Sequence, residues 1–289
     1  MDTIAQQLLR SEAIASSQIE GIDVPSHRAL AKAAAGNHHR ANAQLALANI
    51  EAVRWVYDWA ARSAEPFSGD VICMIHEKLA AADRHLARHA GQIRTRQNWI
   101  GHDPYTPVDA DFIPPPPREV LPLLADLCEY ANREDVAPLV QAAAIHAQFE
   151  TIHPFADGNG RVGRSLIGAV LARRQVCRDV VPPVSLVLAG DREAYTGALG
   201  RWRFELDGHS RWIVHLARAC EAAALASTRL AGQVSGLQDR WRQMAGTPGG
   251  TLRLRRSSLP CPPTRFSVRP APRARLGGVR WPRGKPLTS

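Results

Sequence analysis

The hydrophobic positions of the chain recur mostly at helical spacing, whereas the alternation typical of strands is scarce. Near the N-terminus, Ile4, Leu8 and Ile19 form one apolar stripe, and Gly21 ends the helix that carries it. We expect helices over residues 2–18, 40–62, 71–82, 118–132, 136–151, a segment ending near 174, and 210–230. The pattern therefore predicts a mainly α-helical protein.

The segment 91–117 departs from this pattern. Gly91 and Gly101 break it, β-forming residues lie between them, and four consecutive prolines end it. We expect a short β-hairpin flap here, followed by a stiff polyproline connector.

The C-terminal residues 247–289 differ in composition from the rest of the chain. The chain of 289 residues has a formal net charge of +9, which is typical of proteins that bind nucleic acid. However, ten basic residues and no acidic residue lie in 247–289, so the remainder is nearly neutral. This basic, proline- and arginine-rich tail has little apolar periodicity, and we expect it to be disordered.

Neither a membrane span nor a secretion signal is apparent in the sequence. The five cysteines are scattered and never form a CxxC pair, which favours free thiols in a reducing compartment. We therefore expect a cytoplasmic protein that does not bind membranes.

The segment 153–164 carries the candidate chemistry. Gly158, Asn159 and Gly160 precede a helix, so their main-chain N–H groups can converge on an anion at its positive end. Arg161 and Arg164 lie three residues apart, on one side of the first helical turn. These features predict a phosphate cradle.

Two further side chains extend that prediction. The carboxylate of Asp157 can hold Mg²⁺ against phosphates, and His153 can exchange a proton near neutral pH. A base, a metal carboxylate, a cradle and two arginines are the groups needed for attack of a hydroxyl on a nucleotide phosphate.

The segment HPFADGNGRVGR (153–164) resembles the Fic (Fido) family signature HPFx[DE]GNGRxxR at every required position. The resemblance extends over about residues 10–230 and implies a Fic-type helical bundle. It also implies an enzyme that transfers AMP from Mg·ATP to a Ser, Thr or Tyr hydroxyl of a target protein and releases pyrophosphate. The chain itself is one candidate target, and a homodimer is one possible assembly.

The resemblance also implies roles for particular residues. They are His153 as general base, Pro154 and Phe155 as structural anchors, Asp157 as Mg²⁺ ligand, Gly158, Asn159 and Gly160 around the α- and β-phosphates, Arg161 and Arg164 on the β- and γ-phosphates, Tyr195 near adenine, and Ile93, Trp99 and Ile100 in a flap that docks the target.

A second motif lies at residues 16–21, SSQIEG, which resembles the family's inhibitory motif [ST]xxxE[GN] in its N-terminal, class II position. Ser16 and Glu20 are spaced i, i+4 and point from one face of a helix. By resemblance, Glu20 pairs with Arg164 and blocks the γ-phosphate. The expected organisation is an N-terminal helical region (1–63), a Fic domain (64–230) and the basic tail (247–289).

Three alternatives stay open. The same cradle and base can remove AMP or transfer another phosphate-containing group. A non-enzymatic regulator can bind nucleic acid through the tail, in a salt-dependent manner, although we do not expect nucleic acid as the main partner. Finally, family members commonly continue into a winged-helix domain, and the tail resembles GC-rich DNA read in a shifted frame.

Overall fold

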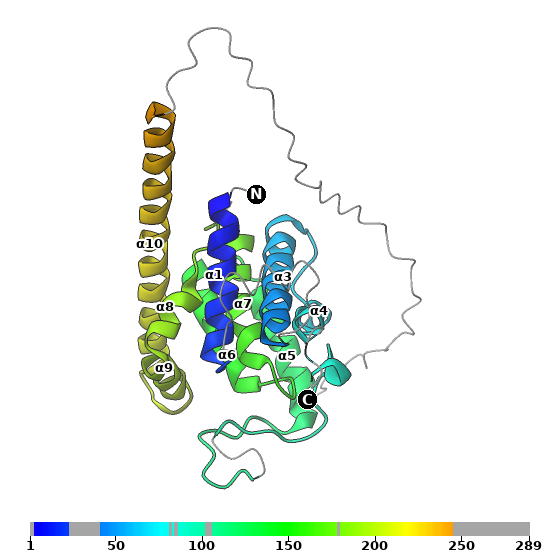
Figure 1. Cartoon of the computed structure of the whole chain (residues 1–289). Helices are drawn as coiled ribbons and strands as arrows, with labels where there is room; N and C mark the ends of the chain where they lie inside the picture. Colours follow the sequence, from blue (N-terminus) through cyan, green and yellow to red (C-terminus); the bar gives the residue numbers. More distant parts are fainter. Residues whose placement is uncertain are drawn as a thin grey trace. The chain divides into compact units, whose positions relative to one another are not determined.

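Most helices that the structure describes lie close to the ranges that hydrophobic spacing predicts (Figure 1). The structure is a computed structural model, and it describes residues 3–22, 41–80, 83, 86–101, 106–177 and 180–244. The helical elements are α1 (Thr3–Ile19), α3 (Ala41–Arg62), α4 (Gly69–Ala80), η1 (Ala87–His89), α5 (Pro117–Ala131), α6 (Pro138–Ile152), α7 (Asn159–Arg173), α8 (Val184–Gly190), α9 (Arg192–Phe204) and α10 (Gly208–Met244).

Sequence spacing missed α8 and α9 and ended α10 too early. Helix α8 has seven residues, which is too short for a helical period to show, and it follows Pro182 and Pro183. Helix α10 continues past 230 to Met244, although its last buried residue is Ala223. One compact unit ends at Gln238, and beyond it the structure describes only residues 239–244. The predicted tail 247–289 lies outside the described residues.

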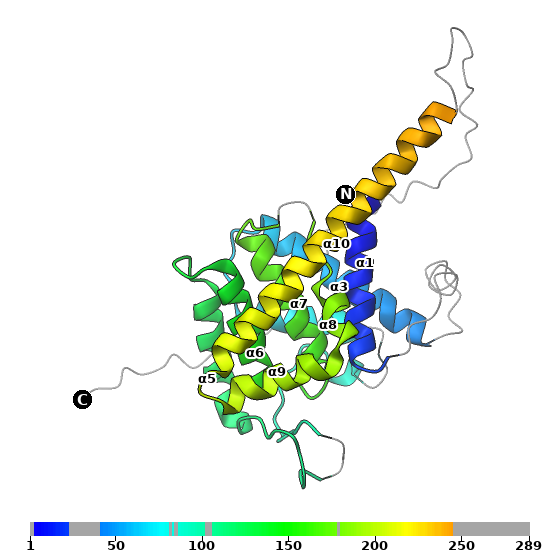
Figure 2. The same cartoon turned by 90° about the vertical axis from the view of Figure 1, so that its left-hand side faces the viewer.

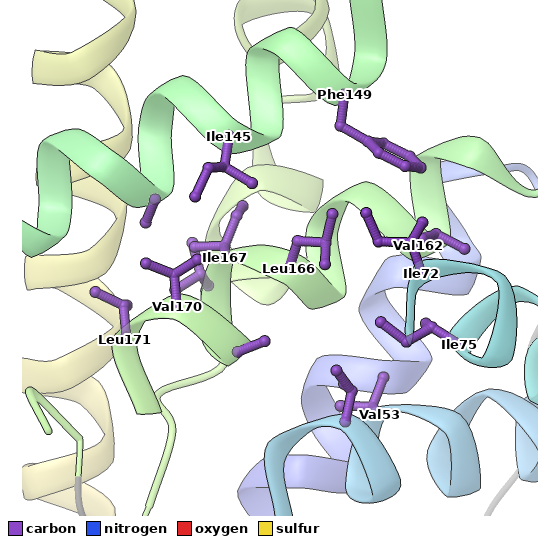
Figure 3. Packing of buried hydrophobic residues seen from close by; sticks show 14 of the residues in the cluster. Val53, Ile72, Ile75, Ile145, Phe149, Val162, Leu166, Ile167, Val170 and Leu171 are labelled. Atoms are coloured by element: carbon purple, nitrogen blue, oxygen red, sulfur yellow. The ribbon is translucent and has the colours of Figure 1, made fainter. Parts of the chain in front are cut away.

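Helix α7 forms the centre of the core. It packs against α1, α3, α4 and α6, and its residues from Val162 to Ala172 are all buried. Figure 3 shows its side chains Val162, Leu166 and Ile167 facing those of neighbouring helices, such as Phe149 of α6. Because apolar groups surround α7 on several sides, its first turn is held rigidly, and that turn carries the candidate cradle.

Helices α1 and α10 cover this core from two other sides (Figure 2). Helix α1 packs against α3 and α8. Trp212 of α10 is fully buried, and its indole N–H donates to the carbonyl of Ala143 in α6 at 2.8 Å. The indole therefore buries a large apolar surface while its polar atom keeps a partner.

The predicted β-hairpin is not seen. In the described part of 91–117, extended pairing is limited to one antiparallel bridge, in which Ile100 and Phe112 exchange two main-chain hydrogen bonds of 2.9 and 3.1 Å. The bridge cannot extend beyond Phe112 because Pro114, Pro115 and Pro116 have no N–H to donate. The flap is thus an irregular segment closed by a single bridge.

Two compositional expectations can be compared with the described residues. Cys73, Cys128, Cys177 and Cys220 are all free thiols, as predicted. Within the same described ranges, none of the helices has the length and apolar character needed to cross a bilayer.

Candidate active site

The loop after α6 begins with an unusual backbone turn at His153. This residue has φ 50° and ψ 60°, the left-handed conformation, and its N–H closes the helix on the carbonyl of Phe149 at 2.9 Å. The turn redirects the chain, so that the fully buried ring of Phe155 enters the core. Asn159 then clamps Phe155: its Oδ1 accepts from the Phe155 N–H at 2.8 Å, and its Nδ2 donates to the Phe155 carbonyl at 2.9 Å.

His76 of α4 packs against this loop and bonds to it, a role that the sequence did not indicate. Its ring stacks on Phe155 with centroids 3.9 Å apart and planes at 6°. Nδ1 accepts from the Gly91 N–H at 3.0 Å, so the ring proton lies on Nε2, 3.1 Å from the carbonyl oxygen of Asp157. Burial lowers the pKa of His76 to about 4, and the ring stays neutral.

Arg94 and Asn98 tie the flap to the same loop. The guanidinium of Arg94 is buried and donates to the carbonyls of His153 (2.8 Å) and Pro115 (2.5 Å), while Asn98 donates to the Phe155 carbonyl at 3.0 Å. These bonds join residues far apart in the chain, so no local pattern could indicate them.

The predicted flap residues are placed differently from one another. Ile93 packs against the hydrophobic core, Ile100 forms the bridge to Phe112, and Trp99 is half-buried. Beside them, the Arg203 guanidinium lies 4.3 Å from the ring centroid of Phe112, which links the flap to α9.

The candidate cradle is the N-terminus of α7. Gly158 caps the helix with φ 78°, a conformation that a side chain would strain. Helix geometry leaves the first N–H groups of α7 without intrahelical partners. Arg161 is buried in its first turn, and its Nε and Nη1 have no hydrogen-bond partner among the described residues. Buried, unpaired cationic nitrogens next to a helix N-terminus are the features of an anion site.

The carboxylate of Glu20, the residue that follows α1, already lies in that cradle. Glu20 Oε1 accepts from Arg164 Nη2 at 2.7 Å, and the side chain of Arg164 is 1% exposed. A Cβ on Gly160 would collide with Glu20 Oε1 and lie 2.9 Å from Arg164 Nη1. Burial alone would raise the pKa of Glu20, but the charge and hydrogen bond of Arg164, together with the charge of Arg161, lower it overall, so the carboxylate is ionised.

Ser16 completes this contact. Its hydroxyl accepts from Arg164 Nε at 3.0 Å and its carbonyl from Nη2 at 2.8 Å. The structure therefore brings Ser16, Glu20 and Arg164 together across more than 140 residues of sequence. Two contacts that the sequence did not indicate hold α1 in place, one made by Asn49 of α3 and one by Glu12 of α1 itself. Asn49 of α3 donates to the Ala13 carbonyl at 2.6 Å, and Glu12 accepts from Ser185.

The side chain of His153 is largely buried and lies near the ionisable side chains of Glu150 and Arg203. Its Nδ1 lies 3.9 Å from Oε2 of Glu150, and both side chains are largely buried. Burial, with the nearby positive charge of Arg203, lowers the pKa of His153 to about 4. Burial raises the pKa of Glu150 to about 7.

Asp157 and Tyr195 have contrasting positions. Asp157 is exposed, and its Oδ1 accepts from the Gly158 N–H at 2.5 Å. Tyr195 is 2% exposed, and its hydroxyl lies 2.9 Å from Nε2 of the buried His146. Because an adenine contact would require this ring to leave the core, we leave Tyr195 out of the proposed nucleotide site.

Together, the described helices and the loop define a mainly helical protein with a candidate anion site at the start of a buried helix. Residues 66–171 match the model of the Fic/DOC family. This chain therefore contains a Fic/DOC family domain.

Individual proteins agree with this assignment. A probable protein adenylyltransferase of Aquifex aeolicus is 37% identical over 91 residues, which are 31% of this chain and 28% of that protein. The protein adenylyltransferase fic-1 of Caenorhabditis briggsae is 33% identical over 129 residues, 44% of this chain and 22% of that protein. The match thus spans less than a third of each relative.

Solved structures show the same fold. The crystal structure of a Fic family protein from Desulfovibrio desulfuricans superposes with a TM-score of 0.63 at 24% sequence identity. The superposition covers 78% of this chain and 66% of that one. The Fic-like helical fold therefore extends beyond the residues that the family model matches.

Proposed function

We propose that this chain is a protein adenylyltransferase that transfers AMP from ATP to a Ser, Thr or Tyr hydroxyl of a target protein, and that α1 inhibits it. The relatives named protein adenylyltransferase support the activity, and the anion site at α7 supports phosphate chemistry.

The observation that carries the proposal is the position of Glu20. Its carboxylate lies over Gly160 and against Arg164, where an anion is favoured by both the helix N-terminus and the guanidinium. A polyphosphate entering the cradle would meet the same groups. Glu20 therefore acts as an internal anion that competes with the γ-phosphate for Arg164.

In the reaction, Nε2 of His153 takes the proton of the target hydroxyl. The hydroxyl oxygen forms a bond to the α-phosphorus of ATP, and the bond from that phosphorus to the bridging oxygen breaks. Pyrophosphate leaves with the electron pair of that bond. The unpaired Nε and Nη1 of Arg161 bind the phosphates, and Arg164 joins them once Glu20 has withdrawn.

The residues present fit a magnesium ion held partly by the substrate. Asp157 offers an exposed carboxylate beside the cradle, and Mg²⁺ commonly binds one or two carboxylates together with phosphates and water. Bound there, the ion would neutralise phosphate charge. The main chain around Asp157 is fixed by His76, so the position of the carboxylate is set before ATP arrives.

The flap is the proposed docking place of the target. Arg94 and Asn98 hold it over the loop, beside the carbonyls of His153 and Phe155. A target segment that pairs with flap main chain, flanked by Ile93, Trp99 and Ile100, would place its hydroxyl near His153 without a strict sequence requirement.

Intact-mass measurement after incubation with Mg·ATP tests the proposal, because self-modification or modification of a supplied target adds the mass of one AMP. We expect Glu20→Gly to label faster than the unaltered protein. The double variant Glu20→Gly/His153→Ala is the control and should lose about 10²- to 10⁴-fold in rate. A Glu20→Gly protein that modifies no protein would refute the proposed activity, and a different added mass would identify another transferred group.

A further inference from the structure

Glu150, one turn before His153 in α6, is a buried carboxyl group that the proposed mechanism does not yet use. Its side chain is 8% exposed and that of His153 is 17% exposed, with Oε2 of Glu150 3.9 Å from Nδ1 of His153. The left-handed turn at His153 ends α6 there, and its imidazole lies within reach of the last helical turn.

Both groups have buried atoms without partners. Nδ1 of His153 and Oε1 of Glu150 form no hydrogen bond with the residues that the structure describes. A buried carboxylate oxygen without a partner is costly. Room for it exists because residue 163 is glycine: a Cβ at that position would collide with Oε1 of Glu150. The fold thus accommodates an unfavourable carboxyl group directly beside the candidate base.

The chemistry of His153 explains why this carboxyl group would be useful. A base that takes a proton becomes an imidazolium, yet burial and Arg203 disfavour that cation, as the lowered pKa of His153 shows. Arg94 adds a further positive charge. Oε2 of Glu150 lies 3.9 Å from Nδ1 of His153, close enough to pair with the ring once that ring is protonated. Glu20 contributes a second negative charge, but it withdraws in the active state.

The main-chain carbonyl of Glu150 is an alternative partner, since it also favours the protonated ring. Arg203 Nη2 already donates to that oxygen at 3.1 Å. The side-chain carboxylate is therefore the better acceptor for Nδ1. A separation of 3.9 Å is longer than a hydrogen bond, but catalytic hydrogen bonds often shorten only when substrate binds.

We propose that Glu150 is the positioning residue of His153: its carboxylate accepts a hydrogen bond from Nδ1–H, which leaves Nε2 unprotonated and facing the hydroxyl of the target. The same carboxylate stabilises the imidazolium that forms when Nε2 takes the proton. The logic is that of an orienting carboxylate in a catalytic triad. This inference rests on the proposed adenylyltransferase activity.

The kinetic test uses Glu150→Gln in the Glu20→Gly background, with Glu129→Gln on the exposed face of α5 as the control. Glutamine keeps the shape and can still accept a hydrogen bond, but it lacks the charge. We expect kcat to fall between about 10- and 10⁴-fold, with the KM for ATP unchanged. Burial raises the pKa of Glu150, and we also expect the part of the pH–rate profile that follows ionisation of Glu150 to disappear. An unchanged kcat and pH profile would overturn the proposal, as would a parallel loss of ATP binding.

A second measurement needs no activity and separates this proposal from the adenylyltransferase proposal. Nitrogen NMR shifts of the His153 ring report which nitrogen carries the proton. We expect the Nδ1–H form in the Glu20→Gly protein and a shift towards Nε2–H in Glu20→Gly/Glu150→Ala. If the ring proton does not respond to residue 150, Glu150 does not position His153, whether or not the protein transfers AMP.

Discussion

The carboxylate of Glu12 in α1 accepts two hydrogen bonds from Ser185 at the start of α8, from the main-chain N–H at 2.7 Å and from the hydroxyl at 2.5 Å. Both residues are buried. Burial raises the pKa of Glu12 to about 7, although the two bonds from Ser185 and the charge of Arg164 oppose the shift. The helix that carries Ser16 and Glu20 is therefore held by a titratable contact.

This contact predicts a pH-dependent stability. Between the ordinary pKa of 4.5 and about 7, the folded protein binds a proton at Glu12 that the unfolded chain has released. The contribution of Glu12 to the free energy of unfolding is thus full below pH 4.5 and is lost as pH rises to about 7. The predicted loss is on the order of 1 to 3 kcal/mol. Urea unfolding at several pH values should show that Glu12→Gln removes this component.

The exposed residue Glu51 on α3 provides the matched control. Glu51→Gln should unfold with the pH dependence of the unaltered protein, including the opposite contributions of the buried histidines. If Glu12→Gln and Glu51→Gln give the same curve, Glu12 does not titrate as described.

Ser16→Ala should partly relieve the proposed inhibition. The substitution removes the hydroxyl that accepts from Arg164 Nε at 3.0 Å, but leaves the Glu20 ion pair in place. A buried donor without its acceptor costs about 1 to 3 kcal/mol. We expect the labelling rate from Mg·ATP to lie between those of the unaltered protein and Glu20→Gly. The half-buried Ser11, on the same helix, donates to the carbonyl of Gln7 and provides the control Ser11→Ala, which should leave the rate unchanged.

Gly160→Ala should destabilise the protein more strongly while Glu20 is present. The new Cβ would collide with Glu20 Oε1, so the cost should shrink in the Glu20→Gly background. A double-mutant cycle measured by urea unfolding should give a coupling of about 0.5 to 3 kcal/mol. Gly197→Ala in α9 is the control, because its Cβ would find its closest neighbour at 3.6 Å, and it should be neutral or stabilising. Strictly additive effects would place Glu20 outside the cradle.

Phe155→Ala should lower stability by about 3 to 5 kcal/mol, because it leaves a cavity under the loop and removes the stack on His76. Phe204→Ala removes an aromatic ring that is 69% exposed and should cost less than about 1 kcal/mol. Thermal unfolding of both variants measures the difference. Equal costs would mean that Phe155 does not anchor the loop.

Much of the fold could be predicted because α-helical order is local. The spacing of apolar residues placed α1, α3 and α5 within about two residues of their observed bounds. The prediction of a β-hairpin was wrong because strand pairing depends on two segments at once. The prolines that follow Phe112 have no main-chain N–H groups, so that segment cannot donate further hydrogen bonds to its partner. Helix α8 was missed because seven residues carry too little of a helical period.

The candidate cradle could be predicted from the amino-acid order, because His153, Asp157, Gly158 and both arginines lie within twelve consecutive residues whose spacing fixes their relation. The surroundings of these residues depend on tertiary packing. His76 and Arg94 bond to the loop, and Ser185 to Glu12 of α1, across long stretches of sequence, which no local pattern specifies. Glu150 lies only three residues from His153, but its burial comes from the packed core. Burial depends on the whole packed core. The charge states of those groups, and therefore the pKa values proposed to govern the site, are set by tertiary packing.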